Sequence, residues 1–330
     1  MPGHCWLARV AAALFAIHAM SGAGAATVSA ETMARPEGTR HYLLVQPAQA
    51  GTDKLPLVIV LHGHSGSAAQ ALGQGRIDDP GVAWLAIADR EHLLVLAPDG
   101  LKGSDGKQGW NDCRADATTN PAADDVGYIG ALIDRAIAEY HADPERVFVT
   151  GISNGGSMTY RAAIELGPRL AAVAVMSASM PAHSLCAAPS HALPLLLTHG
   201  TADKLAPYAG GEVGSWLLKG RGSDIGVEAS VKLWRELDRL QDTPAVSVVP
   251  HRDPGDATRA TRYLWGADPR QLQVELLKID GGGHMPPSVA HRLPWLLASL
   301  LGAQNGDVEF TEEAWTFFKD KRAGLAPAAQ

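Results

Sequence analysis

Short runs of consecutive apolar residues recur along the chain from about residue 55 onward, separated by stretches of helical periodicity. Five runs are continuously apolar, and a sixth, residues 274–279, alternates more between apolar and polar positions. Continuous apolar runs of this length are typical of parallel strands that helices cover on both faces. The five continuous runs are residues 57–61, 93–97, 147–150, 171–176 and 195–198.

The stretches between these runs place apolar residues on one face of a helix. Residues 128–140 do so with Ile129 and Ile133, and Asp124 just before them is a helix-start signal. Such strand–helix alternation predicts the α/β class, with a doubly wound, mostly parallel sheet and helices on both faces. The other helical patterns are residues 157–166, 230–240 and 311–321, the last of which buries Trp315 and Phe318.

Length and composition fit one large globular domain. The chain has 330 residues, of which 46% are hydrophobic and 19% charged, and no repeat or low-complexity linker divides it. Two stretches fit the alternation poorly: residues 208–225 are rich in glycine, and residues 285–307 carry an apolar patch. We expect such insertions to shape the mouth of a site, although ordinary surface loops would look the same.

The N-terminus has the pattern of a secretory signal. His4 and Arg9 precede an apolar run over residues 10–20, and the small residues SGAGAA follow it. This predicts a signal peptide over residues 1–25, with cleavage after Ala25 and a domain over residues 26–330. A membrane anchor is the alternative, but the run is short for a bilayer span, and no later segment is apolar enough to span. We therefore expect a secreted or periplasmic protein.

The net charge and the cysteine content limit the classes of binding partner and the cellular compartment that fit this chain. The net charge is −7 and no run of Lys or Arg forms a basic stripe, which argues against nucleic acid as a partner. Removal of the signal leaves two cysteines, Cys113 and Cys186. In an exported chain they are expected to form a disulfide, with two unrelated buried thiols as the alternative.

The strongest local motif is the sequence GISNGG at residues 151–156, between a predicted strand and a predicted helix. This is the setting of a G-x-S-x-G nucleophile elbow, in which glycines permit a sharp turn that exposes Ser153. The start of the following helix adds a positive dipole end where negative charge develops. A nucleotide-binding loop is disfavoured because G-x-G-x-x-G is absent.

A serine hydroxyl needs a base, and the base needs a carboxylate that orients it. In this fold the chain order is Ser, then Asp or Glu, then His. Asp203 lies in the loop after the strand at residues 195–198, although a plain turn residue would look the same. His284 follows three glycines directly after the strand at residues 274–279. His199 is interpreted as a support for the acid loop.

The oxyanion of the transition state needs two N–H donors. The N–H of Asn154, the residue after the nucleophile, is expected to supply one. The loop HGHSG after the first predicted strand supplies the other, with His64 preferred and Ser65 as the alternative. His62 and His64 could also bind a metal, but no third ligand has suitable spacing. No cofactor is expected.

These motifs occur together in one known family. The set LHGHSGSA, APDG, GWNDC, DPERVFVTGISNGGSM, HGTAD and GGGH resembles the polyhydroxybutyrate depolymerase-like esterases, a group that includes feruloyl and acetylxylan esterases. The resemblance extends from about Gly38 to Phe318. It implies a secreted, cofactor-free α/β-hydrolase with its triad on Ser153, Asp203 and His284.

The chain departs from that family beside the base. Members usually continue GGGH with Thr-Trp-Pro-Gly, whereas this chain has Met285-Pro286-Pro287. An aromatic wall is therefore missing or supplied by Trp110 or Trp295, and we take Trp110 and Met285 as candidate substrate contacts. Polymer-degrading members often carry an extra substrate-binding domain, for which these 330 residues leave no room. A soluble or oligomeric ester is thus at least as good a candidate as insoluble polymer.

The predicted reaction is ester hydrolysis through an acyl-enzyme on Ser153. A peptidase or amidase of the same fold is the first alternative, and a non-catalytic binding protein of this fold is the second. The sequence does not indicate the acyl or alcohol group of the substrate.

Overall fold

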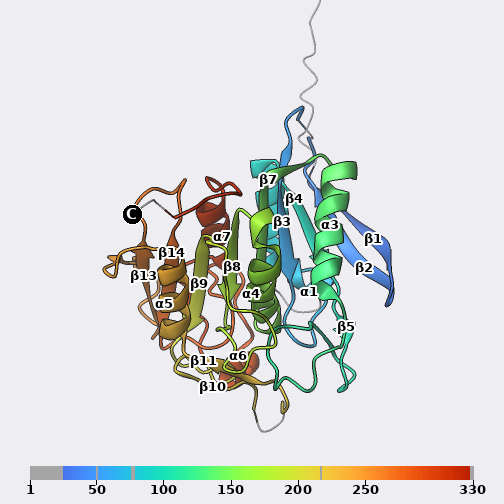
Figure 1. Cartoon of the computed structure of the whole chain (residues 1–330). Coiled ribbons are helices and arrows are strands. Elements are labelled where there is room, and N and C mark those ends of the chain that lie inside the picture. Colours follow the sequence, from blue (N-terminus) through green and yellow to red (C-terminus); the bar gives the residue numbers. More distant parts are fainter. Residues whose placement is uncertain (1–24, 50, 76–78, 216–217, 328–330) are drawn as a thin grey trace, which may run out of the picture.

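The computed structural model describes residues 25–49, 51–75, 79–215 and 218–327. In chain order, the strands of its main sheet are β1 (Thr27–Arg35), β2 (Gly38–Gln46), β3 (Leu55–Leu61), β4 (Leu94–Pro98), β7 (Ala142–Ile152), β8 (Ala172–Met176), β9 (Leu195–Gly200), β12 (Ala245–Val248), β13 (Arg259–Trp265) and β14 (Val274–Asp280). They are arranged in the order β1-β2-β4-β3-β7-β8-β9-β14-β13-β12 (Figure 1). The six strands from β4 to β14 are parallel, and an antiparallel pair extends each edge.

Helices cover both faces of this sheet. The helices are α1 (Ala68–Ala71), α2 (Ala83–Glu91), α3 (Asp125–Glu139), α4 (Asn154–Leu166), α5 (Val227–Leu237), α6 (Trp295–Leu301) and α7 (Phe310–Phe318). Apolar residues of α3, α4 and α5 pack in one core with one face of the strands, and those of α1, α2 and α7 pack in a second core on the other face. Two short hairpins, β5 (Leu101–Lys102) with β6 (Gln108–Gly109) and β10 (Gly210–Glu212) with β11 (Ser223–Ile225), lie outside the sheet.

The predicted fold class is confirmed. All six predicted strands and all four predicted helices form, and each predicted strand lies in the parallel part of the sheet. The antiparallel edge strands were not predicted; in β12 all four residues are exposed and Ser247 interrupts the apolar residues, so no continuous apolar run marks this strand. The predicted signal peptide lies almost entirely outside the described residues. Within them, no helix is both long and apolar enough to cross a membrane.

One buried carboxyl group should make stability depend on pH. Asp238 caps the C-terminal end of α5 and is only 2% exposed. Its Oδ1 accepts the N–H of Leu193, while its Oδ2 has no hydrogen-bond partner. Burial raises the pKa of Asp238 to about 8. The folded protein therefore holds a proton that the unfolded chain loses near pH 4, and its stability falls as the pH rises from about 4 to about 8.

We expect Asp238→Asn to stabilise the protein most at high pH, because the amide keeps the Oδ1 acceptor and cannot ionise. Chemical denaturation at pH 5 and pH 9 should show a gain in unfolding free energy that grows with pH and reaches at least about 1 kcal/mol at pH 9. The exposed Asp53→Asn is the matched control, with an equal effect at both pH values. A pH-independent effect of Asp238→Asn would contradict the assignment.

Candidate active site

Ser153 occupies a strained turn between β7 and α4. Its φ is 56° and its ψ is −123°, a conformation that L-residues rarely adopt. The turn also packs closely against its surroundings, since a Cβ added to Gly155 would lie 2.4 Å from the carbonyl oxygen of Leu61. A Cβ on Gly151 would lie 2.4 Å from the oxygen of Gly155. A side chain would therefore collide with the backbone at both Gly151 and Gly155, as the motif in the sequence predicts.

The side chain of Asn154 ties this turn to a neighbouring loop. Its Oδ1 accepts the N–H of Trp110 at 2.7 Å, and its Nδ2 donates to Asp112 Oδ2 at 2.7 Å. Asp112 is itself fully buried; burial alone would raise its pKa, but the adjacent Arg114 guanidinium holds that pKa below its usual value. The ionised Asp112 carboxylate is thus buried and holds the nucleophile turn through its hydrogen bond with Asn154. Sequence reasoning missed this role of Asp112.

Asp203 and His284 come together at the carboxyl edge of the sheet. Asp203 lies three residues after β9 and His284 four residues after β14, and His284 Nδ1 donates to Asp203 Oδ2 at 2.8 Å. The other oxygen, Asp203 Oδ1, accepts the N–H groups of Leu205 and Ala206. Burial opposes ionisation of Asp203, but the imidazoles of His284 and His199 keep its pKa below the usual range. A carboxylate on Nδ1 leaves Nε2 of His284 free to accept a proton.

His199 supports the acid loop, as predicted. Its ring is fully buried, and Nε2 bonds the carbonyl oxygen of Ala206 at 2.8 Å. A carbonyl can only accept, so this nitrogen carries the proton. Nε2 of His199 also lies 3.4 Å from Asp203 Oδ2.

Ser153 and His284 line one cavity of about 320 Å³. Among the described residues, no hydrogen bond joins the hydroxyl of Ser153 to the imidazole of His284. Such bonds are often long in unliganded enzymes and tighten when substrate binds. Both irregular stretches also contribute to the wall: Leu205, Val213 and Leu218 come from the segment around the glycine-rich one, and Met285 and Leu301 from the other. The two stretches therefore shape the mouth of the cavity.

Two backbone N–H groups remain candidates for an oxyanion hole. Asn154 is the first residue of α4, so its N–H has no acceptor within the helix. Ser65 lies beside His64 in the loop after β3, but its N–H donates to the carbonyl oxygen of Gln108 at 2.7 Å. That bond removes Ser65 from consideration and favours the N–H of His64, which lies in the lining of the same cavity.

The side chains of His62 and His64 are unsuited to a shared metal. His62 Nδ1 bonds the carbonyl oxygen of Gly63, and its Nε2 accepts the N–H of Gly100, so both nitrogens are engaged. His64 Nε2 lies 3.0 Å from Asp105 Oδ2 without hydrogen-bond geometry. Burial lowers the pKa of His64 to about 4, and the nearby Arg221 adds to this shift. His64 is therefore neutral near pH 7.

The expectation that Trp110 contacts substrate is wrong in this structure. Its side chain is 0% exposed, its Nε1 donates to the carbonyl oxygen of His62, and its ring lies 4.9 Å from the His62 ring. An aromatic residue in a loop can point outward or inward, and here the inward position satisfies the indole N–H. Met285 does line the cavity. The side chain of Trp295 lies outside what the structure describes.

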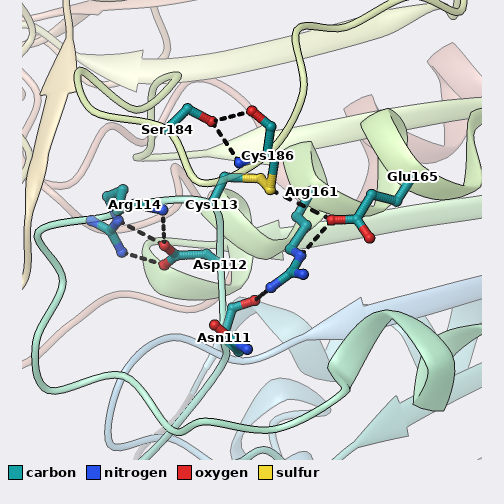
Figure 2. The surroundings of a disulfide bond; sticks show 8 residues. All are labelled: Asn111, Asp112, Cys113, Arg114, Arg161, Glu165, Ser184 and Cys186. Atoms are coloured by element: carbon teal, nitrogen blue, oxygen red, sulfur yellow. Dashed lines mark hydrogen bonds and ion pairs between the residues drawn. A yellow bond between two sulfur atoms is a disulfide. The ribbon is translucent and has the colours of Figure 1, made fainter.

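The predicted disulfide is present. Cys113 and Cys186 are bonded, with their Cα atoms 5.3 Å apart (Figure 2). The bridge joins the loop that carries Asp112 to the segment after β8, next to the Arg161–Glu165 ion pair on α4. Because Asp112 holds Asn154, the bridge fixes one side of the nucleophile turn through a single intervening side chain.

We expect loss of the bridge to cost stability more than turnover. The double variant Cys113→Ser/Cys186→Ser opens a loop with a sequence separation of 73 residues. Loop-closure entropy then predicts a loss of about 4 kcal/mol in unfolding free energy. Denaturant titration of the two proteins checks this, with the wild type under reducing conditions as a second arm. A loss below about 1 kcal/mol would contradict the stabilising role.

Arg221 is a cavity residue that sequence reasoning missed. It lines the same cavity as Ser153 and is only 5% exposed. The glycine-rich loop that contains Arg221 was expected to lie at the mouth of a site. No periodicity in its sequence indicated which side chain would point into the cavity.

Comparisons with known proteins found several similar esterases. Residues 40–193 match the family model described as esterase PHB depolymerase. A putative esterase, NocK, from Nocardia uniformis subsp. tsuyamanensis is 26% identical over 79% of this chain and 75% of its own length. Feruloyl esterase B from Piromyces equi is 27% identical over 71% of this chain, which spans only 40% of that relative. An acetyl xylan esterase from Aspergillus awamori shares the fold, with a TM-score of 0.53 at 17% identity, over 78% of this chain and 94% of that structure.

Proposed function

We propose that the chain is a member of the PHB depolymerase family of esterases, whose family model matches residues 40–193, and that it is an exported enzyme that hydrolyses carboxylic esters through an acyl-enzyme on Ser153. The observation that carries the proposal is the placement of Ser153. It lies at a positive-φ turn in the wall of a cavity that also receives His284, whose Nδ1 is held by buried Asp203.

The reaction follows from these atoms. His284 Nε2 accepts the hydroxyl proton of Ser153 as Oγ bonds the ester carbonyl carbon, and the carbonyl electron pair moves to oxygen. The N–H groups of Asn154 and His64 stabilise that oxyanion. When the electrons return, the ester C–O bond breaks and the alcohol leaves with the proton from His284.

Water completes the cycle through the same base. It attacks the acyl carbon while its proton passes to His284 Nε2, and collapse of the second intermediate releases the carboxylic acid and returns the proton to Ser153 Oγ. Asp203 keeps the imidazole in the tautomer that has Nε2 free and stabilises the imidazolium. Each step uses only groups of the protein and water, so we propose no cofactor.

Export is supported by two features. The N-terminal 25 residues have the pattern of a secretory signal, and the Cys113–Cys186 disulfide suits an oxidising compartment. We therefore place the enzyme in the periplasm or the medium, with a domain over residues 26–330.

The proposed function is tested by matched pairs of substrates. Purified protein should hydrolyse 4-nitrophenyl esters of short acids, and it should cleave the corresponding anilides at least about 100-fold more slowly, because 4-nitroanilide is a much poorer leaving group than 4-nitrophenolate. Hydrolysis of anilides at the rate of esters would favour a peptidase or amidase. Failure on every ester, with the protein folded, would favour a non-catalytic binding protein.

A further inference from the structure

The wall of the proposed active site contains an arginine whose charge is not matched by a protein carboxylate. Arg221 Nη1 donates to Thr119 Oγ1 at 2.7 Å, whereas its Nη2 is buried without a hydrogen-bond partner. Among the described residues, no carboxylate forms an ion pair with Arg221. A buried guanidinium without such a partner is costly, and its presence in a cavity indicates a binding role.

The loop holds this side chain in place. Arg221 lies between Gly220 and Gly222, both at positive φ, with values of 68° and 80°. A Cβ on Gly220 would lie 2.7 Å from Thr118 Oγ1, so the loop packs directly on the segment that supplies Thr119. The carbonyl oxygen of Gly220 also accepts both the N–H and the hydroxyl of Thr119. Several contacts therefore fix the position of Arg221.

The rest of the lining leaves Arg221 as a single positive charge in a mostly apolar space. Leu205, Val213 and Leu218 come from the same part of the chain as Arg221, and Met285 and Leu301 come from the segment after β14. Burial lowers the pKa of Arg221 to about 10, which still leaves it cationic at neutral pH.

Among the other ionisable side chains of the lining, His64 is neutral near pH 7, and the carboxylate of Asp79 accepts the N–H of Gly81. Asp105 and Asp112 act on Arg221 only from beyond ion-pair distance.

We propose that Arg221 is a specificity residue that pairs with a carboxylate on the substrate, so that the preferred esters carry one free acid group joined to an apolar acyl or alcohol part. One cation balances one monoanion, whereas a phosphate dianion would remain half unpaired in an apolar cavity. The carboxylate would accept from the guanidinium of Arg221, whose Nη2 has no hydrogen-bond partner in the described part of the protein. This inference rests on the proposed function and names the substrate class of the same site.

The test compares charged and neutral esters of equal shape. For a carboxylate on the acyl side, the pair is mono-4-nitrophenyl adipate and its terminal carboxamide; for one on the alcohol side, the pair is 4-acetoxybenzoate and 4-acetoxybenzamide. The quantity measured is the ratio of kcat/KM for the acid to that for the amide, which cancels effects on turnover common to both. Wild-type enzyme should favour the acid in at least one pair, and that pair identifies the side that carries the carboxylate.

In Arg221→Gln, this ratio should fall by roughly 30-fold or more, mainly through KM for the acid, because a buried charge pair loses one partner. Arg221→Lys should keep part of the preference. Arg322→Gln is the matched control: it removes a charge beside Asp143 and Glu145 at the opposite edge of the sheet and should leave the ratio unchanged. An unchanged ratio in Arg221→Gln for both pairs would overturn the inference while the proposed function stands.

A second measurement uses the unmodified enzyme and does not depend on the variant folding. Hexanoate should inhibit hydrolysis of a neutral ester at a lower concentration than hexanamide does. Equal inhibition would contradict a carboxylate site. If the wild type hydrolyses none of the four esters, the proposed function itself fails, and this inference fails with it.

Discussion

Replacement of Ser153 by alanine should lower kcat for ester hydrolysis by about 10⁶-fold, as loss of the nucleophile does in serine triads. The variant keeps a Cβ, so the strained backbone with φ of 56° meets no new contact, and folding should be preserved. What remains is the small catalysis that binding and the oxyanion donors supply without a nucleophile. The rate on a 4-nitrophenyl ester and the thermal unfolding midpoint measure the two parts of this expectation.

Ser157→Ala is the control for that experiment. Ser157 lies one turn further along α4, and its hydroxyl bonds only the carbonyl oxygen of Ser153, at 3.4 Å. Its loss should change kcat by less than about 10-fold, because no charge develops there. If Ser153→Ala kept more than about 1% of wild-type turnover on an activated ester, Ser153 would not be the nucleophile.

The second large effect is expected from Asp203→Asn, which should reduce kcat by about 10⁴-fold. The amide can still accept the N–H groups of Leu205 and Ala206 through Oδ1, so the loop should hold its shape. The group facing His284 Nδ1 then becomes an NH₂ donor, which favours the tautomer with the proton on Nε2. That tautomer cannot take the proton of Ser153. Steady-state rates with matched protein concentrations measure the loss.

Asp238→Asn serves as the comparison, since it also replaces a buried carboxyl group by an amide. Asp238 bonds the N–H of Leu193, just before β9 begins, whereas Asp203 lies beyond the end of that strand. Its replacement should leave kcat within about 3-fold of wild type, because it is remote from the reacting atoms. A loss of less than about 10-fold in Asp203→Asn would show that His284 is oriented by another group.

The part of the fold that could be predicted is the part whose burial is uniform. Strands β3, β4, β8 and β9 are buried at every residue, so their sequences are continuous apolar runs. The edge strands lack this signal, since β1 mixes exposed and half-buried positions and β12 is exposed throughout. Their place is set by pairing to neighbouring strands, which is a tertiary property.

The candidate site also contains residues whose positions could be predicted from the sequence and residues whose positions could not. Ser153, Asp203 and His284 each follow a recognisable strand, so their positions at one sheet edge could be inferred from chain order alone. The orientation of loop side chains could not: Trp110 turns inward because its indole N–H reaches the carbonyl oxygen of His62. Arg221 faces the cavity because contacts to Thr119 hold its loop. Such contacts join residues far apart in the chain and leave no local pattern.

Covalent labelling with a fluorophosphonate tests the central claim most directly, because these reagents phosphonylate a serine only when its base and oxyanion donors are assembled. We expect one adduct per chain, located by peptide mass spectrometry on Ser153 and absent from Ser153→Ala. The same reagent should react far more slowly with Asp203→Asn. An adduct on another residue, or full ester hydrolysis by protein that no fluorophosphonate inhibits, would contradict it.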